Sequence, residues 1–252
     1  MQQVETQAIN QESNARISVF VISFNRQAVI GACLAPLSFA DELIVVDKSS
    51  TDRTAEIAAQ YSHRVITVPW SPVVEDTRAF ALSRCSHEWI LCLDDDECLS
   101  AEAVAFIRQE LRAPRADIYG IAQRHWILGV HDERAYYWPE FQPRLFRRGA
   151  VSFVRTVHSG YVFHSERRYD VPPEGGVCVH HLSHRNVTEW ITKTNPIRRY
   201  RIGCALLILA MISLLLRMNG STSGAAERVT QPQTATRSQW PCCGPYTTLS
   251  TG

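Results

Sequence analysis

Four consecutive acidic residues directly follow an apolar stretch. The segment reads WILCLDDDE, with the apolar run at 89–93 and the acidic residues at Asp94, Asp95, Asp96 and Glu97. Carboxylates this close repel one another unless a cation or several hydrogen-bond donors lie among them. Hard oxygen ligands with room for water suit Mg²⁺ or Mn²⁺ bound together with phosphate groups. The plainer alternative is a solvated acidic turn or a surface calcium site.

Two further polar turns follow apolar stretches nearer the N-terminus. ISVFVI at 17–22 runs into a turn that contains Ser23 and Asn25, and ELIVVD at 42–47 ends in Asp47. In a parallel sheet all three turns would lie at the carboxyl-end edge, where such sheets bind ligands. The helix N-terminus expected after each turn favours anions nearby. Taken singly, Asn25 and Asp47 are equally well explained as helix-capping turn residues, so it is their combination that indicates a site.

Strands and helices alternate along the first half of the chain. Apolar runs predict strands at 17–22, 42–47, 64–68 and 89–93. Helices are predicted at 27–37, 51–61, 75–85 and 100–112. Thr51 or Ser50 is the expected N-cap of the second helix, and Ser100 is that of the last. This alternation predicts an α/β fold with a mostly parallel, doubly wound sheet.

Composition and missing motifs narrow the function classes. The chain has 252 residues with 26 basic and 25 acidic side chains, so a sizeable domain is expected and no nucleic-acid partner is indicated. No G-x-G-x-x-G follows 17–22, and no G-x-x-x-x-G-K-[ST] occurs, which argues against a dinucleotide site and a P-loop. The first sixteen residues lack the apolar core of a secretory signal, so we expect a cytoplasmic protein with reduced thiols.

The motifs resemble those of the family 2 glycosyltransferases, which have the GT-A (Rossmann-like) fold. ISVFVISFNR, ELIVVDKSSTDRT, the helix segment TRAFAL and WILCLDDDE occur in the order and rough spacing of that family. The likeness covers roughly residues 17–195. The segment YWPEFQPRLFRRG at 137–149 is similar to the lipopolysaccharide core β-glucosyltransferase-like branch.

The resemblance implies a nucleotide-sugar donor, with a UDP-hexose as the expected molecule. Ser23, Asn25 and Asp47 would hold its nucleoside, and Arg78 would face the nucleotide or its phosphates. Asp94, with its neighbour Asp95, would reach the ribose or the donor sugar.

The same resemblance implies a divalent cofactor, Mg²⁺ or Mn²⁺, bound by Asp96. Such an ion stabilises the departing diphosphate as a Lewis acid. Arg78 or Arg147 would add fixed positive charge near that leaving group.

A general base must take the proton from the acceptor hydroxyl. A His-Glu pair is expected after the RLFR segment in this branch, but the chain has His158-Ser159 there. Glu140 is therefore the predicted catalytic base, with Asp132 and Glu133 as substitutes. An ordinary loop carboxylate is the alternative interpretation of Glu140.

A second departure from the family pattern follows Asp47. The family favours a small residue and then glycine, where this chain has Lys48 and Ser49. Lys48 would approach a phosphate or be solvated, and Ser49 is expected to strain a turn that glycine makes freely.

Three histidines lie close together near the end of the resemblance, at His180, His181 and His184. Neutral imidazoles bind metals. The resemblance to GT-A enzymes, many of which complete the metal site with a late histidine, implies His181 as the second metal ligand. Histidines that only pack in a strand are the alternative. Several aromatic residues are candidates for an acceptor groove or for core packing, namely Trp126, Tyr136, Tyr137, Trp138 and Trp190.

The predicted organisation has four parts. A polar tail at 1–16 precedes a nucleotide-sugar-binding half at 17–125 and an acceptor-binding half at 126–195. Residues 196–252 hold an apolar segment, 202–216, and an atypical tail that is expected to be disordered. As a helix the apolar segment would be about 22 Å long, short of a hydrocarbon core of about 30 Å. Arginines flank it, so we expect peripheral attachment to the inner face of the cytoplasmic membrane.

These observations predict an inverting, metal-dependent glycosyltransferase. It would move a hexose from a nucleotide sugar to an envelope glycan or a lipid-linked acceptor of the lipopolysaccharide core type. Two alternatives stay open: a non-catalytic nucleotide-sugar or glycan-binding protein, and a sugar-phosphate nucleotidyltransferase. The nucleotidyltransferase would require a glycine-rich basic loop after 17–22, and SFNR is not one.

Overall fold

The computed structural model describes residues 15–71, 74–135, 137–154 and 160–191. The apolar segment 202–216, His158 and Ser159 lie outside these ranges, as do Tyr136, residues 1–14 of the predicted N-terminal tail and the whole part at 196–252. Within the described ranges, no helix is both long enough and apolar enough to cross a bilayer.

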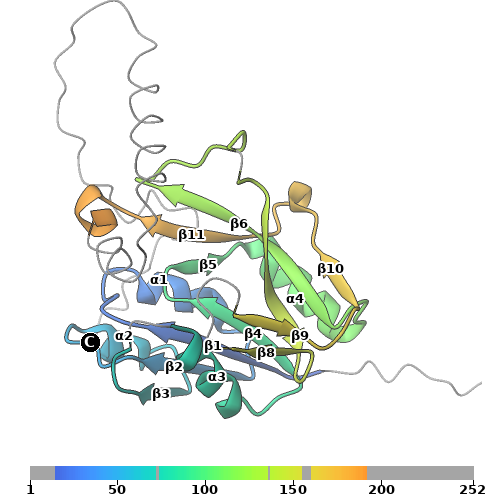
Figure 1. Ribbon diagram of the computed structural model, residues 1–252, viewed down its shortest axis with the longest axis horizontal. Coiled ribbons are helices and arrows are strands. Elements are labelled where there is room, and N and C mark those ends of the chain that lie inside the picture. The colour runs from blue at the N-terminus through green and yellow to red at the C-terminus, as the bar shows by residue number, and fades with distance from the viewer. Residues whose placement is uncertain (1–14, 72–73, 136, 155–159, 192–252) are drawn as a thin grey trace, which may run out of the picture.

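A nine-stranded mixed sheet forms the centre of the fold, and it confirms the predicted α/β architecture (Figure 1). Its strand order is β3-β2-β1-β4-β7-β6-β11-β5, with β10 also paired to β6. The strands span β1 Ile17–Ser23, β2 Glu42–Asp47, β3 Arg64–Thr67, β4 Trp89–Asp94, β5 Glu97–Leu99, β6 Ile118–Ile127, β7 Glu140–Arg147, β10 Arg168–Asp170 and β11 Cys178–His184. The first four predicted strands pair in parallel, whereas β7 runs antiparallel to both β4 and β6, and β5 runs antiparallel to β11.

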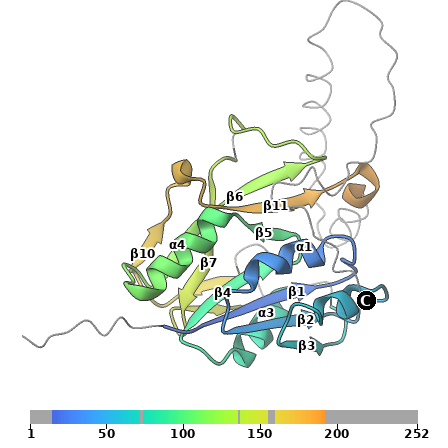
Figure 2. The same ribbon diagram turned by 180° about the vertical axis from the view of Figure 1, so that it is seen from behind.

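Helices and a small second sheet cover the two faces. The helices span α1 Ile30–Leu34, α2 Thr54–Ala58, α3 Val74–Arg84 and α4 Ala101–Arg112, with 3₁₀ turns η1 Ala35–Leu37 and η2 Pro173–Gly175. The small sheet pairs β8 Val151–Phe153 with β9 Tyr161–Phe163. One core packs α1, η1, α2 and α4 on one face (Figure 2), and the other packs α3 and β8 on the opposite face.

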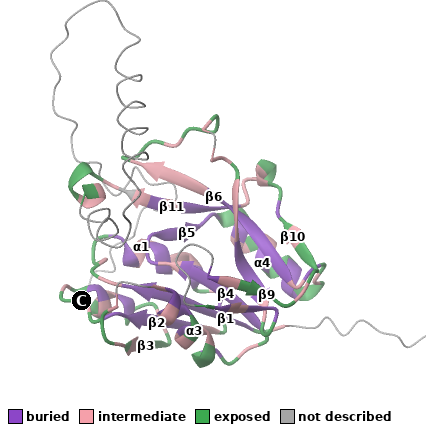
Figure 3. Ribbon diagram, in the orientation of Figure 1, coloured by how far each residue is buried: buried purple, intermediate pink, exposed green. Residues whose placement is uncertain are grey.

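The central strands are buried on both faces, as a doubly covered parallel sheet requires (Figure 3). All seven residues of β1 are buried, and its successive side chains enter the two cores alternately. Two cysteines, Cys85 and Cys92, lie buried in the core on the α3 side as small apolar residues.

Helix boundaries differ from the sequence prediction at two starts. The helix predicted at 27–37 begins at Ile30 and tightens into a 3₁₀ turn at Ala35, beside Pro36. The helix predicted from 51 begins at Thr54, with Arg53 in the N-cap position, and the Asp52 carboxylate accepts the Thr54 N–H at 2.9 Å. The predicted caps Ser50 and Thr51 are therefore wrong.

Ser100 caps α4 as predicted and also joins two elements. Its Oγ accepts the Ala103 N–H at 3.0 Å, donates to the Gly176 carbonyl at 2.9 Å and accepts the Cys178 N–H at 3.3 Å. A single buried hydroxyl thus fixes the start of α4 against β11.

We expect Ser100→Ala to lower the free energy of unfolding by about 1–3 kcal/mol, because it removes a helix cap and leaves buried backbone groups unpaired. Urea unfolding measures the change. Ser83→Ala is the matched control: its exposed Oγ bonds only the Phe80 carbonyl within its own helix, so a change below about 0.5 kcal/mol is expected. Equal losses in the two variants would contradict the assignment.

Candidate active site

The three polar turns meet at one sheet edge, as the sequence predicts. Ser23 is the register partner of Asp47, and Ile22 is the partner of Asp94, so β1, β2 and β4 end at the same level. A pocket of about 260 Å³ opens there. Its lining comprises Ile22, Ser23, Phe24, Arg26, Lys48, Val74, Arg78, Asp94, Asp95 and Asp96. The predicted donor-site residues therefore surround one cavity, with the exceptions of Asn25 and Asp47.

Asn25 joins the first two turns and does not line the pocket. Its Oδ1 accepts the Thr51 N–H at 2.8 Å, and its own N–H donates to Ser50 Oγ at 2.9 Å. Its φ is 53°, and that of Ser49 is 58°. Both residues thus occupy the left-handed region, which confirms the strained turn expected at Ser49.

Ser23 and Asp47 each carry a buried polar atom without a hydrogen-bond partner among the described residues. Asp47 is 2% exposed; its Oδ2 accepts the Ser50 N–H at 2.9 Å, while Oδ1 has no donor. Ser23 Oγ is likewise unpartnered and belongs to a residue that lines the pocket. Leaving such groups unsatisfied costs about 1–3 kcal/mol each, which marks this edge of the sheet as a place where a further donor would be stabilising.

Asp94 is held by two arginines. Arg78 donates to both of its carboxylate oxygens, at 2.7 and 2.9 Å, and Arg144 lies 3.4 Å from Oδ2. Burial alone would raise the pKa of Asp94, but Arg78 and then Arg144 outweigh it and lower that pKa below its ordinary value. Asp94 therefore stays ionised. Arg78 also lines the pocket, and one nitrogen of its guanidinium is already hydrogen-bonded to Asp94.

Arg144 was not anticipated, and the expectation for Arg147 is wrong. Arg144 also pairs with Glu97, whose side chain is fully buried. Arg147 instead pairs with Asp117 and Glu88, opposite Trp89 at the far end of β4. Because β7 runs antiparallel to β4, Arg144 lies beside the acidic turn at the end of β4, and Arg147 lies near the start of β4.

Asp95 bridges the turns after β1 and β4. Its oxygens accept the Phe24 N–H and the Arg26 Nε–H, each at 3.0 Å. Burial raises the pKa of Asp95 to about 6, against the opposing charge of Arg26. Arg26 also bonds Glu189 at 2.9 Å, and sequence reasoning had given it no role.

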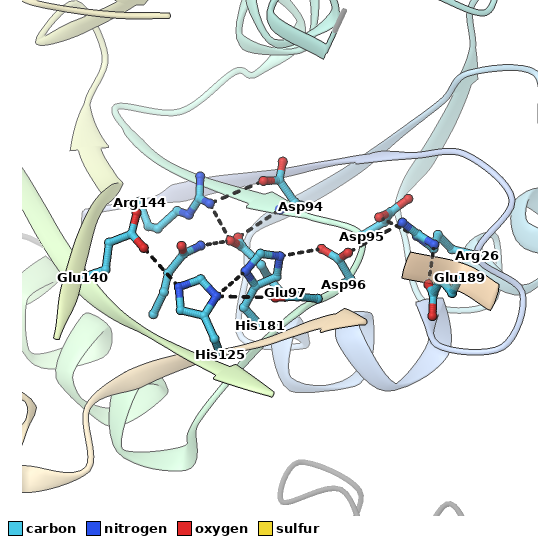
Figure 4. Close-up of polar contacts among 12 residues, drawn as sticks. Arg26, Asp94, Asp95, Asp96, Glu97, His125, Glu140, Arg144, His181 and Glu189 are labelled. Atoms are coloured by element: carbon cyan, nitrogen blue, oxygen red, sulfur yellow. Dashed lines mark hydrogen bonds and ion pairs between the residues drawn. The ribbon is translucent and has the colours of Figure 1, made fainter. Parts of the chain in front are cut away.

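Asp96 and His181, the two predicted metal ligands, lie together (Figure 4). His181 Nε2 is 3.3 Å from Asp96 Oδ1. Burial lowers the pKa of His181, but the charges and hydrogen bond of Asp96, with Glu97 and Asp94, raise it overall, so positive charge is favoured here. The described residues contain no group of three or more potential ligands arranged around a single point. Mg²⁺ sites completed by substrate phosphates use one or two protein carboxylates, and Asp96 supplies one, with the His181 imidazole as a neighbouring nitrogen ligand.

Glu140, the predicted base, lies at the start of β7 outside the pocket lining (Figure 4). Its side chain is 44% exposed, its Oε2 is 3.1 Å from His125 Nε2, and its Oε1 accepts from Gln142 at 2.8 Å. Burial and the neighbouring His181 lower the pKa of His125, which keeps it neutral near pH 7.

The substitute bases and the aromatic candidates lie elsewhere. Asp132 contacts Arg134, and Glu133 contacts Arg124, on an exposed loop. Trp126 and Trp138 pack around His131, with Arg124 over the Trp138 ring, and Tyr137 packs edge-on against His125.

Arg144 is expected to hold the buried part of the acidic turn. Arg144→Met leaves the Glu97 charge inside the protein without its cation, so we expect unfolding to become easier by about 3–5 kcal/mol. Adding Glu97→Gln should recover part of that loss. Arg147→Met on the same strand is the control and should cost about 1 kcal/mol or less, since Glu88 is exposed and Asp117 keeps a second cation, Arg167. Urea denaturation gives all three values, and similar losses for Arg144→Met and Arg147→Met would contradict this assignment.

Comparisons with known proteins agree with this geometry. The chain is 32% identical over 194 residues to an uncharacterised glycosyltransferase of Rickettsia felis, covering 71% of this chain and 66% of that protein. It is 31% identical over 170 residues to the lipopolysaccharide core biosynthesis glycosyltransferase LpsC of Rhizobium meliloti, covering 64% of this chain and 58% of LpsC. The chain thus spans between about half and two thirds of such relatives.

Among solved structures, residues 1–349 of S. aureus TarS with UDP-GlcNAc match at a TM-score of 0.51 and 16% identity, over 69% of this chain and 60% of that one. This likeness confirms the GT-A type of fold. Residues 18–183 match the family described as Glycosyl transferase family 2. The chain belongs to glycosyl transferase family 2.

Proposed function

We propose that this chain is an inverting, metal-dependent glycosyltransferase that moves a hexose from a UDP-sugar to an envelope glycan or lipid-linked acceptor. The observation that carries the proposal is the convergence of two unpartnered buried groups, on Ser23 and Asp47, with the Asp96–His181 pair at one sheet edge. The printed name of LpsC supports an acceptor of the lipopolysaccharide core type. The UDP-GlcNAc in the TarS structure motivates the choice of a UDP-sugar.

The nucleoside end of the donor is assigned to the β1 and β2 turns. Asp47 Oδ1 is a buried acceptor without a donor, and it suits the imide N–H of a uracil ring. Ser23 Oγ offers a second polar contact from the pocket wall. Asn25 would act by holding the two turns together, and Asp95 by fixing the Phe24 N–H and Arg26.

The diphosphate end is assigned to Asp96, His181 and the arginine that faces the pocket. A divalent ion held by Asp96 and His181 would supply Lewis-acid stabilisation of the leaving diphosphate. Arg78 contributes fixed positive charge, and its bidentate bond keeps Asp94 ionised and oriented toward the donor sugar. Lys48 lines the same pocket and adds a further cation.

Glu140 is proposed as the general base. It is half-exposed and anchored by His125 and Gln142, so one face of the carboxylate stays open to an acceptor hydroxyl.

Two alternative functions remain to be compared. A sugar-phosphate nucleotidyltransferase is disfavoured, because the turn after β1 reads SFNR and is not a glycine-rich basic loop. A non-catalytic nucleotide-sugar or glycan-binding protein is distinguished from an enzyme by the assays below.

Asp96→Ala should abolish donor turnover, with a loss of about 10³-fold or more, because a metal ligand on the leaving diphosphate is removed. The measurement is UDP release from UDP-hexose with Mn²⁺, with and without EDTA, and Mn²⁺-dependent UDP binding should vanish in the same variant. Glu56→Ala removes an exposed carboxylate of α2 away from the pocket and is the control. Full activity in Asp96→Ala, or in wild type with EDTA, would refute metal dependence; UDP-sugar binding without any turnover would favour the binding-protein alternative.

Glu140→Gln should lower kcat by about 10²-fold or more while the affinity for UDP-sugar stays near wild type, because only the proton acceptor is lost. Steady-state transfer or donor hydrolysis gives kcat, and calorimetric titration with UDP-sugar gives the affinity. Glu56→Gln, an exposed carboxylate on α2 that pairs with Arg53, is the matched control. Wild-type kcat in Glu140→Gln would show that this carboxylate is not the base.

A further inference from the structure

A chain of polar contacts connects the proposed base with the proposed metal ligand. Glu140 Oε2 lies 3.1 Å from His125 Nε2, and His125 Nδ1 lies 3.0 Å from His181 Nδ1. His181 Nε2 then lies 3.3 Å from Asp96 Oδ1. Figure 4 shows the four side chains in that order, coming from β7, β6, β11 and the turn after β4.

The proton positions along this chain follow from what each group is able to donate. A carboxylate only accepts hydrogen bonds, so the contact with Glu140 requires the proton of His125 on Nε2. In a neutral imidazole the other nitrogen is then an acceptor, and His125 Nδ1 must receive a hydrogen from His181 Nδ1. Ser183 Oγ, 3.4 Å from the same His125 nitrogen, is a hydroxyl and is compatible with this arrangement.

The contact between His181 and Asp96 determines what this series of polar contacts does. Without a metal ion, a second proton on His181 Nε2 is donated to Asp96 Oδ1 across 3.3 Å. A metal ion at Asp96 would take the place of that Nε2 proton, while the Nδ1–H of His181 stays engaged with His125. The reverse tautomer would turn the lone pair of His125 Nε2 onto the Glu140 carboxylate, so it breaks the first contact.

We propose that His125 is a positioning residue that, anchored by Glu140, fixes the tautomer of His181 so that Nε2 is available to the donor-bound metal ion. The proposal rests on the proposed function, because it needs a metal site at Asp96 and His181. Histidines that bind metals commonly donate their other N–H to an oriented partner, and that partner influences both ring orientation and affinity. Here an imidazole takes that place, and a carboxylate holds the imidazole.

The directions in which side chains face on β6 and β11 support a specific role for His125 and not only a packing role. On β6, Gln123 and His125 face the acidic side, where Gln123 donates to Glu97, whereas Trp126 faces away and bonds His180. On β11, His181 faces the site and His180 faces Trp126. His180 therefore offers a control histidine, because it is next to His181 in sequence but faces away from the site.

Mn²⁺ binding in the presence of UDP, followed by electron paramagnetic resonance, tests the proposal without turnover. His125→Phe should weaken Mn²⁺ binding by about 10–100-fold. His125→Asn should retain most of the affinity, because its Oδ1 takes the place of Nδ1 as the acceptor from His181. His180→Asn is the control and should leave the affinity unchanged, since its Oδ1 still accepts from Trp126. Glu140→Gln should bind Mn²⁺ nearly normally, because the amide oxygen still accepts from His125, although its kcat falls.

Nitrogen-15 spectra of the wild-type histidines, recorded with Mg²⁺ and UDP, give a readout that needs no variant. We expect His125 to be protonated at Nε2 and His181 at Nδ1; the opposite assignment would overturn the proposal. Equal Mn²⁺ affinity in wild type, His125→Phe and His125→Asn would also overturn it. Absence of Mn²⁺ binding to the wild type with UDP would instead refute the metal site of the proposed function, so the two failures are distinguishable.

Discussion

Repulsion among four consecutive carboxylates at the end of β4 is the constraint that organises the site. Each carboxylate contacts a cationic or protonatable side chain from a different element. Asp94 contacts Arg78 of α3, and Asp95 contacts Arg26 of the turn after β1. Asp96 contacts His181 of β11, and Glu97 contacts Arg144 of β7. Because buried charges are tolerated only when they are paired, these contacts determine which elements surround the end of β4.

The same pairing explains why the two halves of the chain share one sheet. Residues 17–125 supply the carboxylates, and residues 126–195 supply Arg144 and His181. β7 lies between β4 and β6, so the second half is hydrogen-bonded directly to the strand that ends in the acidic turn. Arg144 and His181 therefore reach the acidic turn from strands of the same sheet, through contacts with Asp94, Glu97 and Asp96.

Sequence patterns within single elements made the part of the site at the ends of β1, β2 and β4 predictable. Strand periodicity located the ends of β1, β2 and β4, and parallel pairing then placed Ser23, Asp47 and Asp94 at one edge. Arg144, Arg26 and the contact of His125 with His181 were not predictable in the same way. Arg144 pairs with Glu97 across 47 positions of sequence, and the direction of β7 decides whether it or Arg147 reaches the turn. Nothing local to RLFR encodes that direction.

The partner of Asp96 differs from those of the other three carboxylates. Asp94, Asp95 and Glu97 each pair closely with an arginine, whereas Asp96 lies 3.3 Å from His181 Nε2 and 3.6 Å from Arg26 Nη2. The Arg26 guanidinium is shared with Asp95 and Glu189, so it neutralises Asp96 only in part. An imidazole allows the balancing positive charge to be a proton or a metal ion, so the acidic turn is stable without the donor while this carboxylate stays available to a cation that accompanies the diphosphate.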